Sequence, residues 1–407
     1  MIAPHPISDS RMIREIWPLL LAAALGLVPF TIFSTFLVGI GAAADRLPEE
    51  VGALRGLGGI AALIVGIAVA PLLDRISRRH LAGLSMLALA AACLIGTIGP
   101  MWTWVVFCLV VGAATATLNP AISAMAADSF ADEAASGRAA TMVSATTTLA
   151  AMLAAPLLAG PALIWGWRGD LVATAVLCLL VAAAQLLPRR GADRAVNSGA
   201  QIGYLDRFRI AARVPGALPL LGISTLRTAA FMGQLAYIAV YYDRFFGLGP
   251  GPFSLIWTLS GFSFFLGNWC AGKALRAFPT DRLAVVVMLV ATLVGTASIL
   301  GLFTAPALWV AAAMTSVTAI CHAVIAACVT TLLVRRAAGS RGAVLALNGA
   351  GQSLGVFAGA ALAAAGLALH GWLGMGGALA VVTAAAVLLA LPLLRRTPVE
   401  TPVETPV

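Results

Sequence analysis

Long apolar runs separated by short polar connections dominate this chain of 407 residues. A helix that spans a membrane needs roughly 20 mostly apolar residues, because backbone polar groups in hydrocarbon find partners only inside the helix. About twelve runs have roughly this length. They lie near residues 16–39, 52–73, 81–98, 103–127, 140–163, 171–187, 217–242, 253–271, 283–303, 308–333, 343–369 and 373–391. The pattern predicts an all-α membrane protein with about twelve transmembrane helices.

The second half of the chain repeats landmarks of the first at a nearly constant spacing. Three pairs of positions align at offsets of 202, 203 and 205 residues: Leu81 with Leu283, Arg138 with Arg341, and Trp167 with Trp372. Internal duplication is a known architecture of membrane transporters. We therefore expect two pseudo-symmetric six-helix halves.

The longest polar stretch divides the two halves and predicts a cytoplasmic linker. Within it, residues 204–213 place arginines and apolar side chains on different helical faces, which favours a helix lying on membrane lipid. Thr-Pro-Val-Glu repeats at the C-terminus are too rich in proline to pack, and they predict a disordered tail. The predicted organisation is residues 1–187 for the first half, 188–216 for the linker, 217–396 for the second half and 397–407 for the tail.

Composition supports the membrane class, and the charges orient the chain within it. The chain is 61% hydrophobic and 10% charged, against about 25% charged residues in soluble domains. Its net charge of +9 does not indicate nucleic-acid binding, because the arginines do not cluster with interleaved aromatic residues. Most of them fall on the side of the N-terminus, whereas Arg46, Arg55, Arg168 and Arg244 fall on the other side. This asymmetry predicts a bacterial-type cytoplasmic (inner) membrane protein with both termini in the cytoplasm.

The connection after the second apolar run resembles the signature of the major facilitator superfamily, G-x-x-x-D-R-x-G-R-R. It reads Asp74-Arg75-Ile-Ser-Arg78-Arg79, with Ala70 and Ser77 in place of the two glycines. The resemblance implies the twelve-helix major facilitator fold, alternating access and a monomer. It also implies that Asp74, Arg75, Arg78, Arg79 and Arg138 form a gating latch that holds the halves together in the outward-open state. The alternative is that the arginines only set topology and contact lipid headgroups.

Residues 151–160, Ala-Met-Leu-Ala-Ala-Pro-Leu-Leu-Ala-Gly, resemble the small-residue and proline motif of the drug:proton antiporter branch. Gly166-Trp167-Arg168 is also typical of that branch, which includes sugar-efflux-like proteins. The chain departs from the pattern at Cys108, which stands where the branch usually has an arginine in its fourth helix. This departure weakens the expectation of proton antiport.

Arg227 is the candidate substrate-binding charge, because charged residues at membrane depth are expensive and usually functional. It lies roughly ten residues into its run, or about 15 Å deep. Gln234 and Tyr241 follow at nearly the same helical angle, with Tyr237 about a quarter-turn away. A guanidinium can make paired hydrogen bonds to a carboxylate or phosphate, which favours an anionic ligand. The alternative is an arginine that binds backbone carbonyls between helices.

Other polar residues in the apolar runs are candidates for the substrate path or for proton coupling. The predicted cavity residues are Thr31, Thr35, Thr115, Asn119, Trp257, Ser260, Phe264, Asn268, Asn348 and Gln352, although such side chains also join helices in lipid. His322 titrates near neutral pH in water and is the candidate proton carrier, with Asp243 as the second candidate. The alternative for His322 is a neutral packing residue. Its neighbours Cys321 and Cys328 are too sparse for a metal site.

We find no nucleotide-binding glycine loop and no nucleophile with a suitable partner, so the sequence predicts neither an enzyme nor a cofactor. The leading hypothesis is a transporter that exports a small amphiphilic or anionic molecule by alternating access, with protons as a second partner if transport is coupled. One alternative is an importer or an uncoupled facilitator of a small metabolite or siderophore-like solute. Another is a transporter-like membrane sensor or assembly factor that moves no substrate.

Overall fold

The computed structural model describes residues 8–73, 76–130, 132–187, 204–278, 280–337 and 340–395. Asp74 and Arg75, residues 188–203 of the linker and the predicted tail lie outside the described residues. Within the described ranges the secondary structure is helical, without a strand. The helices are α1 (Asp9–Leu25), α2 (Val28–Thr35), α3 (Leu37–Ala43), α4 (Pro48–Ala53), α5 (Arg55–Leu73), α6 (Arg78–Gly96), α7 (Met101–Asp128), α8 (Glu133–Leu186), α9 (Tyr204–Arg213), α10 (Ala217–Phe246), α11 (Pro250–Ala277), α12 (Asp281–Phe303), α13 (Leu308–Arg336) and α14 (Arg341–Arg395).

The chain is an all-α membrane protein, as the apolar runs predict. Eight stretches of the described residues are long and apolar enough to cross a membrane, and two of them have 52 and 54 residues. Each of these two, Ala135–Leu186 and Arg341–Leu394, covers two of the predicted runs. α10 and α11 have 30 and 28 residues but fall outside the eight, because they carry more polar side chains.

The two longest helices bend at glycines that correspond in the internal repeat. Gly166 in α8 has φ 68° and ψ 176°, and Gly371 in α14 has φ 61° and ψ −152°. This region of backbone space is essentially restricted to glycine. The two glycines are 205 residues apart (371 − 166 = 205), the same spacing as their neighbouring tryptophans. The repeat seen in the sequence is therefore also a repeat of backbone geometry.

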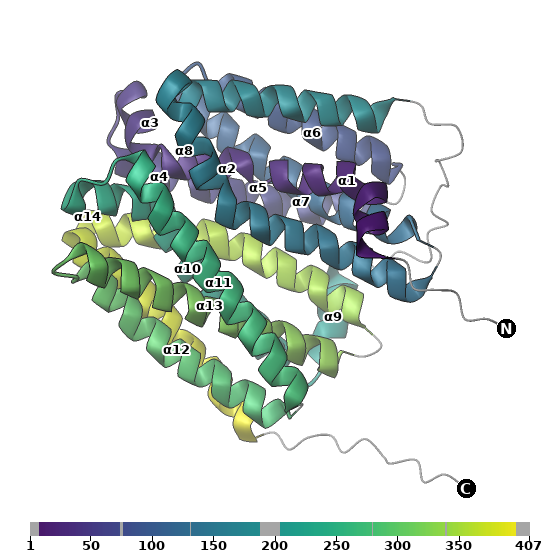
Figure 1. The fold of residues 1–407 in the computed structure, drawn as a ribbon. Helices are drawn as coiled ribbons and strands as arrows, with labels where there is room; N and C mark the ends of the chain where they lie inside the picture. Colours follow the sequence, from purple (N-terminus) through teal and green to yellow (C-terminus); the bar gives the residue numbers. More distant parts are fainter. Residues whose placement is uncertain are drawn as a thin grey trace, which may run out of the picture.

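The two halves of the chain form two helical bundles that meet along two seams. α5 packs against α14 in one seam, and α8 packs against α11 in the other. Glycines allow close approach in both: a Cβ on Gly59 would lie 2.6 Å from the backbone of α14, and one on Gly261 would lie 2.8 Å from Met152 in α8. Figure 1 shows the bundles close together at the end with α3 and α4 and farther apart where α1 begins.

The buried cores agree with two bundles that are close at one end and separate at the other. We call the end where α1 begins and α14 ends the terminal face, and the end with α3, α4 and the two bends the opposite face. One core runs through the first bundle and includes, near the opposite face, Tyr237, Tyr242 and Trp372 of the second half. A second core contains only residues of α9 and of the second half, from Ala211 to Leu393. The bundles thus share buried contacts at the opposite face and pack separately toward the terminal face.

Replacing Gly166 tests the backbone constraint at the first bend. We expect Gly166→Ala to reduce stability by about 1–3 kcal/mol, because alanine must adopt a backbone region that it disfavours. A Cβ at Gly166 meets no atom within 4 Å, so the cost arises from the backbone alone. Thermal unfolding of the purified protein measures the effect.

The matched control is Gly160→Ala in the same helix. Gly160 has helical geometry and equally open surroundings, so alanine there should be neutral or stabilising by about 0.5–1 kcal/mol. Equal melting temperatures for the two variants would show that the bend does not depend on glycine.

Candidate central binding site

A cavity of about 230 Å³ lies between the two bundles. Residues of both halves of the chain form its walls. The lining residues are Leu27, Phe30, Thr31, Arg55, Thr147, Thr148, Ala151, Phe231, Met232, Leu235, Trp257, Ser260, Gly261 and Phe264. Apart from Arg55, these side chains are neutral and mostly apolar. The cavity therefore combines an apolar wall with a single positive charge.

Arg55 supplies that charge from the first residue of α5. Its Nη1 donates a hydrogen bond to Ser34 Oγ, and its guanidinium carbon lies 5.5 Å from the centre of the Phe30 ring. No carboxylate pairs with it in the described part of the chain. A cation held against an aromatic ring in an apolar cavity has lost part of its hydration, and this increases its attraction for an anion.

The sequence analysis placed Arg55 on the outer side of the membrane and did not name it as a cavity residue, whereas the structure places it in the cavity wall. The spanning stretch begins at Pro48, seven residues before Arg55 (55 − 48 = 7), so Arg55 lies about 10 Å along it. The prediction began this run at residue 52, four residues after the start of α4 (52 − 48 = 4). The deeper placement could have been recognised from Pro48 followed by two acidic residues, a typical first turn of a helix.

Arg227 is buried inside the second bundle and does not line the cavity. It is 6% exposed. Its Nη2 donates to Thr228 Oγ1 at 2.9 Å, its Nη1 donates to the His322 carbonyl at 3.5 Å, and its Nε has no partner. The structure therefore places Arg227 in a helix-to-helix contact between α10 and α13, behind the cavity wall formed by Phe231.

The other predicted residues of α10 lie toward the opposite face. Gln234, Tyr237 and Tyr241 are buried. Tyr241 donates to the Leu302 carbonyl at 2.7 Å, and the Tyr237 ring packs against Gly52 of α4, where a Cβ would lie 2.9 Å from it. These side chains close one end of the molecule and do not line the cavity.

Four of the remaining predicted cavity residues line the cavity: Thr31, Trp257, Ser260 and Phe264. Thr31 donates to the Leu27 carbonyl at 3.1 Å, and Trp257 Nε1 donates to the Ala151 carbonyl at 2.9 Å across the seam between α11 and α8. Thr35 is buried, whereas Asn119 and Asn268 are exposed. None of these last three lines the cavity.

The two candidates for proton coupling have different surroundings. His322 is fully buried, neither ring nitrogen has a hydrogen-bond partner, and its ring lies 5.3 Å from that of Phe231. His322 is therefore separated from the cavity by one aromatic side chain. Asp243 is half-buried near the end of α10, at the opposite face.

A direct ionic contact joins the two bundles at the opposite face. Arg244 Nη1 of α10 lies 2.8 Å from Glu49 Oε1 of α4. The aromatic core around Tyr237 lies between this ion pair and the cavity. Closure at this face therefore consists of an aromatic layer capped by an ion pair.

Comparisons with known proteins identify the family. The sequence model of the Major Facilitator Superfamily matches residues 19–338. The chain belongs to the major facilitator superfamily. A comparison with curated protein sequences gives no match.

Solved transporters share the fold of this superfamily member. A bacterial homologue of the human lysosomal transporter Spinster, in an inward-facing and unoccupied conformation, is 17% identical, with 96% of each chain covered and a TM-score of 0.71. The nucleoside transporter NupG is 14% identical, with 94% of this chain and 98% of NupG covered and a TM-score of 0.72. The human organic anion transporter MFSD10 is 17% identical, with 94% and 100% covered and a TM-score of 0.64.

The superfamily signature is only partly within the described residues, because Asp74 and Arg75 lie outside them. Arg78 forms an ion pair with Asp128 at the end of α7, and Arg79 donates to the Leu187 carbonyl at the end of α8. Arg138 Nη1 lies 3.3 Å from Asp9 Oδ1 of α1. These contacts all lie within the first bundle, so they tie its helices together at the terminal face. The latch across the two bundles stays a prediction.

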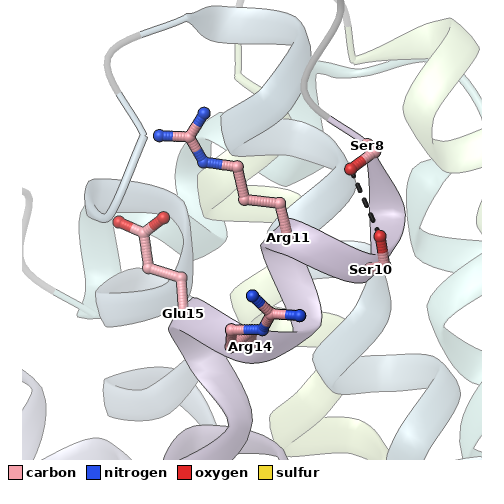
Figure 2. Close-up of a pocket in the computed structure, with 5 residues that line it drawn as sticks. All are labelled: Ser8, Ser10, Arg11, Arg14 and Glu15. Atoms are coloured by element: carbon pink, nitrogen blue, oxygen red, sulfur yellow. Dashed lines mark hydrogen bonds between the residues drawn. The ribbon is translucent and has the colours of Figure 1, made fainter.

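A second hollow, of about 500 Å³, lies on the surface at the start of α1. Figure 2 shows its residues, Ser8, Ser10, Arg11, Arg14 and Glu15, on the first turns of that helix. All of these side chains are exposed. A site formed by one helix end cannot be exposed alternately to two sides of a membrane, so the central cavity is the candidate transport site in this superfamily member.

The ion pair at the opposite face provides a test of the closure. We expect Glu49→Gln to increase the open population at this face by up to about fivefold, because a partly exposed pair contributes about 0.2–1 kcal/mol. Spin labels at Leu47→Cys and Phe245→Cys, in a Cys270→Ser background, report the distance between the bundles.

The charge-reversed double variant, Glu49→Arg with Arg244→Glu, is the control and should restore the closed distance. An unchanged distance distribution in Glu49→Gln would show that the aromatic layer alone holds this face closed.

Proposed function

We propose that this protein is a secondary transporter that carries a small organic molecule, amphiphilic or anionic, across the membrane by alternating access. The observation that carries the proposal is the cavity between the bundles, lined by residues of both halves. A ligand bound there touches both bundles, so a rocking motion of one against the other can expose it to either side. Membership of the superfamily supports the same mechanism.

The arrangement of the bundles favours an inward-facing state. If the terminal face is cytoplasmic, as the distribution of arginines predicts, then the closed opposite face is the outer side. The shared core and the Glu49–Arg244 pair close that side. In this state the cavity is reached from the cytoplasm, as an exporter requires for loading. We therefore propose export as the direction of net transport.

Flux through the purified protein in liposomes tests transport itself. A panel of anionic, neutral and cationic small solutes should contain at least one that crosses faster than in empty liposomes. We expect Gly59→Ala to reduce that flux by roughly fivefold or more, the ratio equivalent to about 1 kcal/mol of overpacking. The reason is that its Cβ would meet the backbone of α14 in the seam on which the bundles move.

Gly66→Ala, on the same helix, is the matched control. A Cβ at Gly66 meets no atom within 4 Å, so flux should equal that of the wild type. If no solute of the panel crosses faster than in empty liposomes, the transport proposal is wrong, and a sensor or assembly role takes its place.

Proton coupling is a separate proposal, and His322 is its candidate residue. His322 is buried one ring away from the cavity, with two unpartnered nitrogens. We expect His322→Gln to abolish the acceleration of flux by an imposed pH gradient, while downhill flux without a gradient continues. Asp243→Asn should retain the acceleration. If the gradient has no effect on the wild type, the protein is a facilitator.

A further inference from the structure

We propose that Arg55 binds the anionic group of the substrate, and that the substrate is a small monocarboxylate with an aromatic or otherwise apolar body. This inference rests on the proposed transport function and names the substrate class for its cavity. Three features of the cavity carry it: a cation without a carboxylate partner, hydroxyl groups that present mainly acceptors, and a wall of stacked aromatic rings.

The first feature is the incomplete coordination of Arg55. A guanidinium has five N–H donors in a fixed fork, and one hydrogen bond is present in the structure, to Ser34. The remaining donors have no acceptor among the described residues. Moving a charge out of water is costly unless it is paired and hydrogen-bonded. A carboxylate can take two of these donors in parallel, and it neutralises the charge.

The second feature is the hydrogen bonding of the threonines. Thr31, Thr147 and Thr148 each donate their hydroxyl hydrogen to a carbonyl one turn earlier in their own helix, at 3.1, 3.0 and 3.1 Å. Their oxygens therefore offer lone pairs to a ligand and would repel an anion. These three residues disfavour an anion in their part of the cavity, so the negative group is directed toward Arg55.

The third feature is the aromatic wall. Phe231 of α10 and Phe264 of α11 stack with ring centres 5.4 Å apart, and Trp257 and Phe30 also line the cavity. Aromatic side chains favour offset or edge contacts with a further ring. The volume of about 230 Å³ lies below the roughly 300–1,000 Å³ of sites for drug-sized ligands. The body of the substrate is therefore small and apolar.

Charge balance favours a single negative charge. Arg55 is the one charged residue among the lining residues, whereas Arg227 donates within the second bundle and is separated from the cavity by Phe231. A doubly charged phosphate would keep an uncompensated charge in an apolar wall. A monocarboxylate leaves the occupied cavity neutral.

Calorimetric titration of the full-length protein with matched probes tests the inference. The probes are benzoate, phenylacetate and 3-phenylpropionate, each compared with its own amide and with the amine of the same skeleton. We expect at least one carboxylate to bind roughly tenfold to a hundredfold more tightly than its amide, the range of a charged hydrogen bond. Equal affinities in every pair, or no binding by any carboxylate, would overturn the inference.

Variants test which residue causes the preference for a carboxylate over its amide. Arg55→Gln should remove it, and Arg55→Lys should retain part of it, because lysine keeps the charge but loses the paired geometry. Arg46→Gln removes an exposed positive charge between α3 and α4 and should leave the preference unchanged. Loss of the preference in Arg227→Gln together with its retention in Arg55→Gln would move the anion site to α10. The wild-type comparison needs no variant, so misfolding of Arg55→Gln would leave that test intact.

Flux separates this inference from the proposed function. If the liposomes transport the amides or amines but not the carboxylates, transport stands and the substrate class is wrong. If they transport none of the solutes of the broad panel, the proposed function itself fails.

Discussion

Every backbone N–H and C=O within a membrane must find its partner inside the protein, and the rest of this structure depends on that constraint. It restricts the chain to helices and leaves side chains to supply all polar function. Where two helices must join, the turn has to occur without exposing the backbone to lipid. Gly166 and Gly371, two of the glycines with positive φ, make such turns in equivalent places of the duplicated halves.

The same scarcity of water makes each intramembrane charge informative, although in different ways. Arg227 and Arg55 are both arginines in apolar surroundings. Arg227 donates to backbone and hydroxyl oxygens of its own bundle, and its contribution is to the packing of α10 against α13. Most N–H donors of Arg55 have no acceptor among the described residues, and its side chain lines the cavity between the bundles. A cation that lines a cavity with free donors is better suited to bind a ligand than one whose guanidinium is enclosed within a bundle.

The halves also preserve an ionic contact while reversing its charges. In the first half, Arg78 at the start of α6 pairs with Asp128 at the end of α7. In the second half, Asp281 at the start of α12 pairs with Arg336 at the end of α13, at 2.9 Å. Both halves thus place an opposite-charge pair between neighbouring helix ends at the terminal face, with the signs exchanged between the two helices.

The sequence by itself determined the membrane class and the duplicated plan, because these follow from the length, apolarity and spacing of segments. It indicated the family through the resemblance of residues 74–79 to the superfamily signature. It also predicted Thr31 and Trp257 as cavity residues, both of which line the cavity. It did not reveal Arg55 as a cavity residue, because that role depends on how the two bundles pack around the start of α5. Nor could it distinguish Arg227 from Arg55 as a free cation, because hydrogen-bond partners such as the His322 carbonyl lie far away in sequence. Only the packing of one bundle against the other decided which polar residues face the cavity, which close the opposite face and which stabilise a bundle from within.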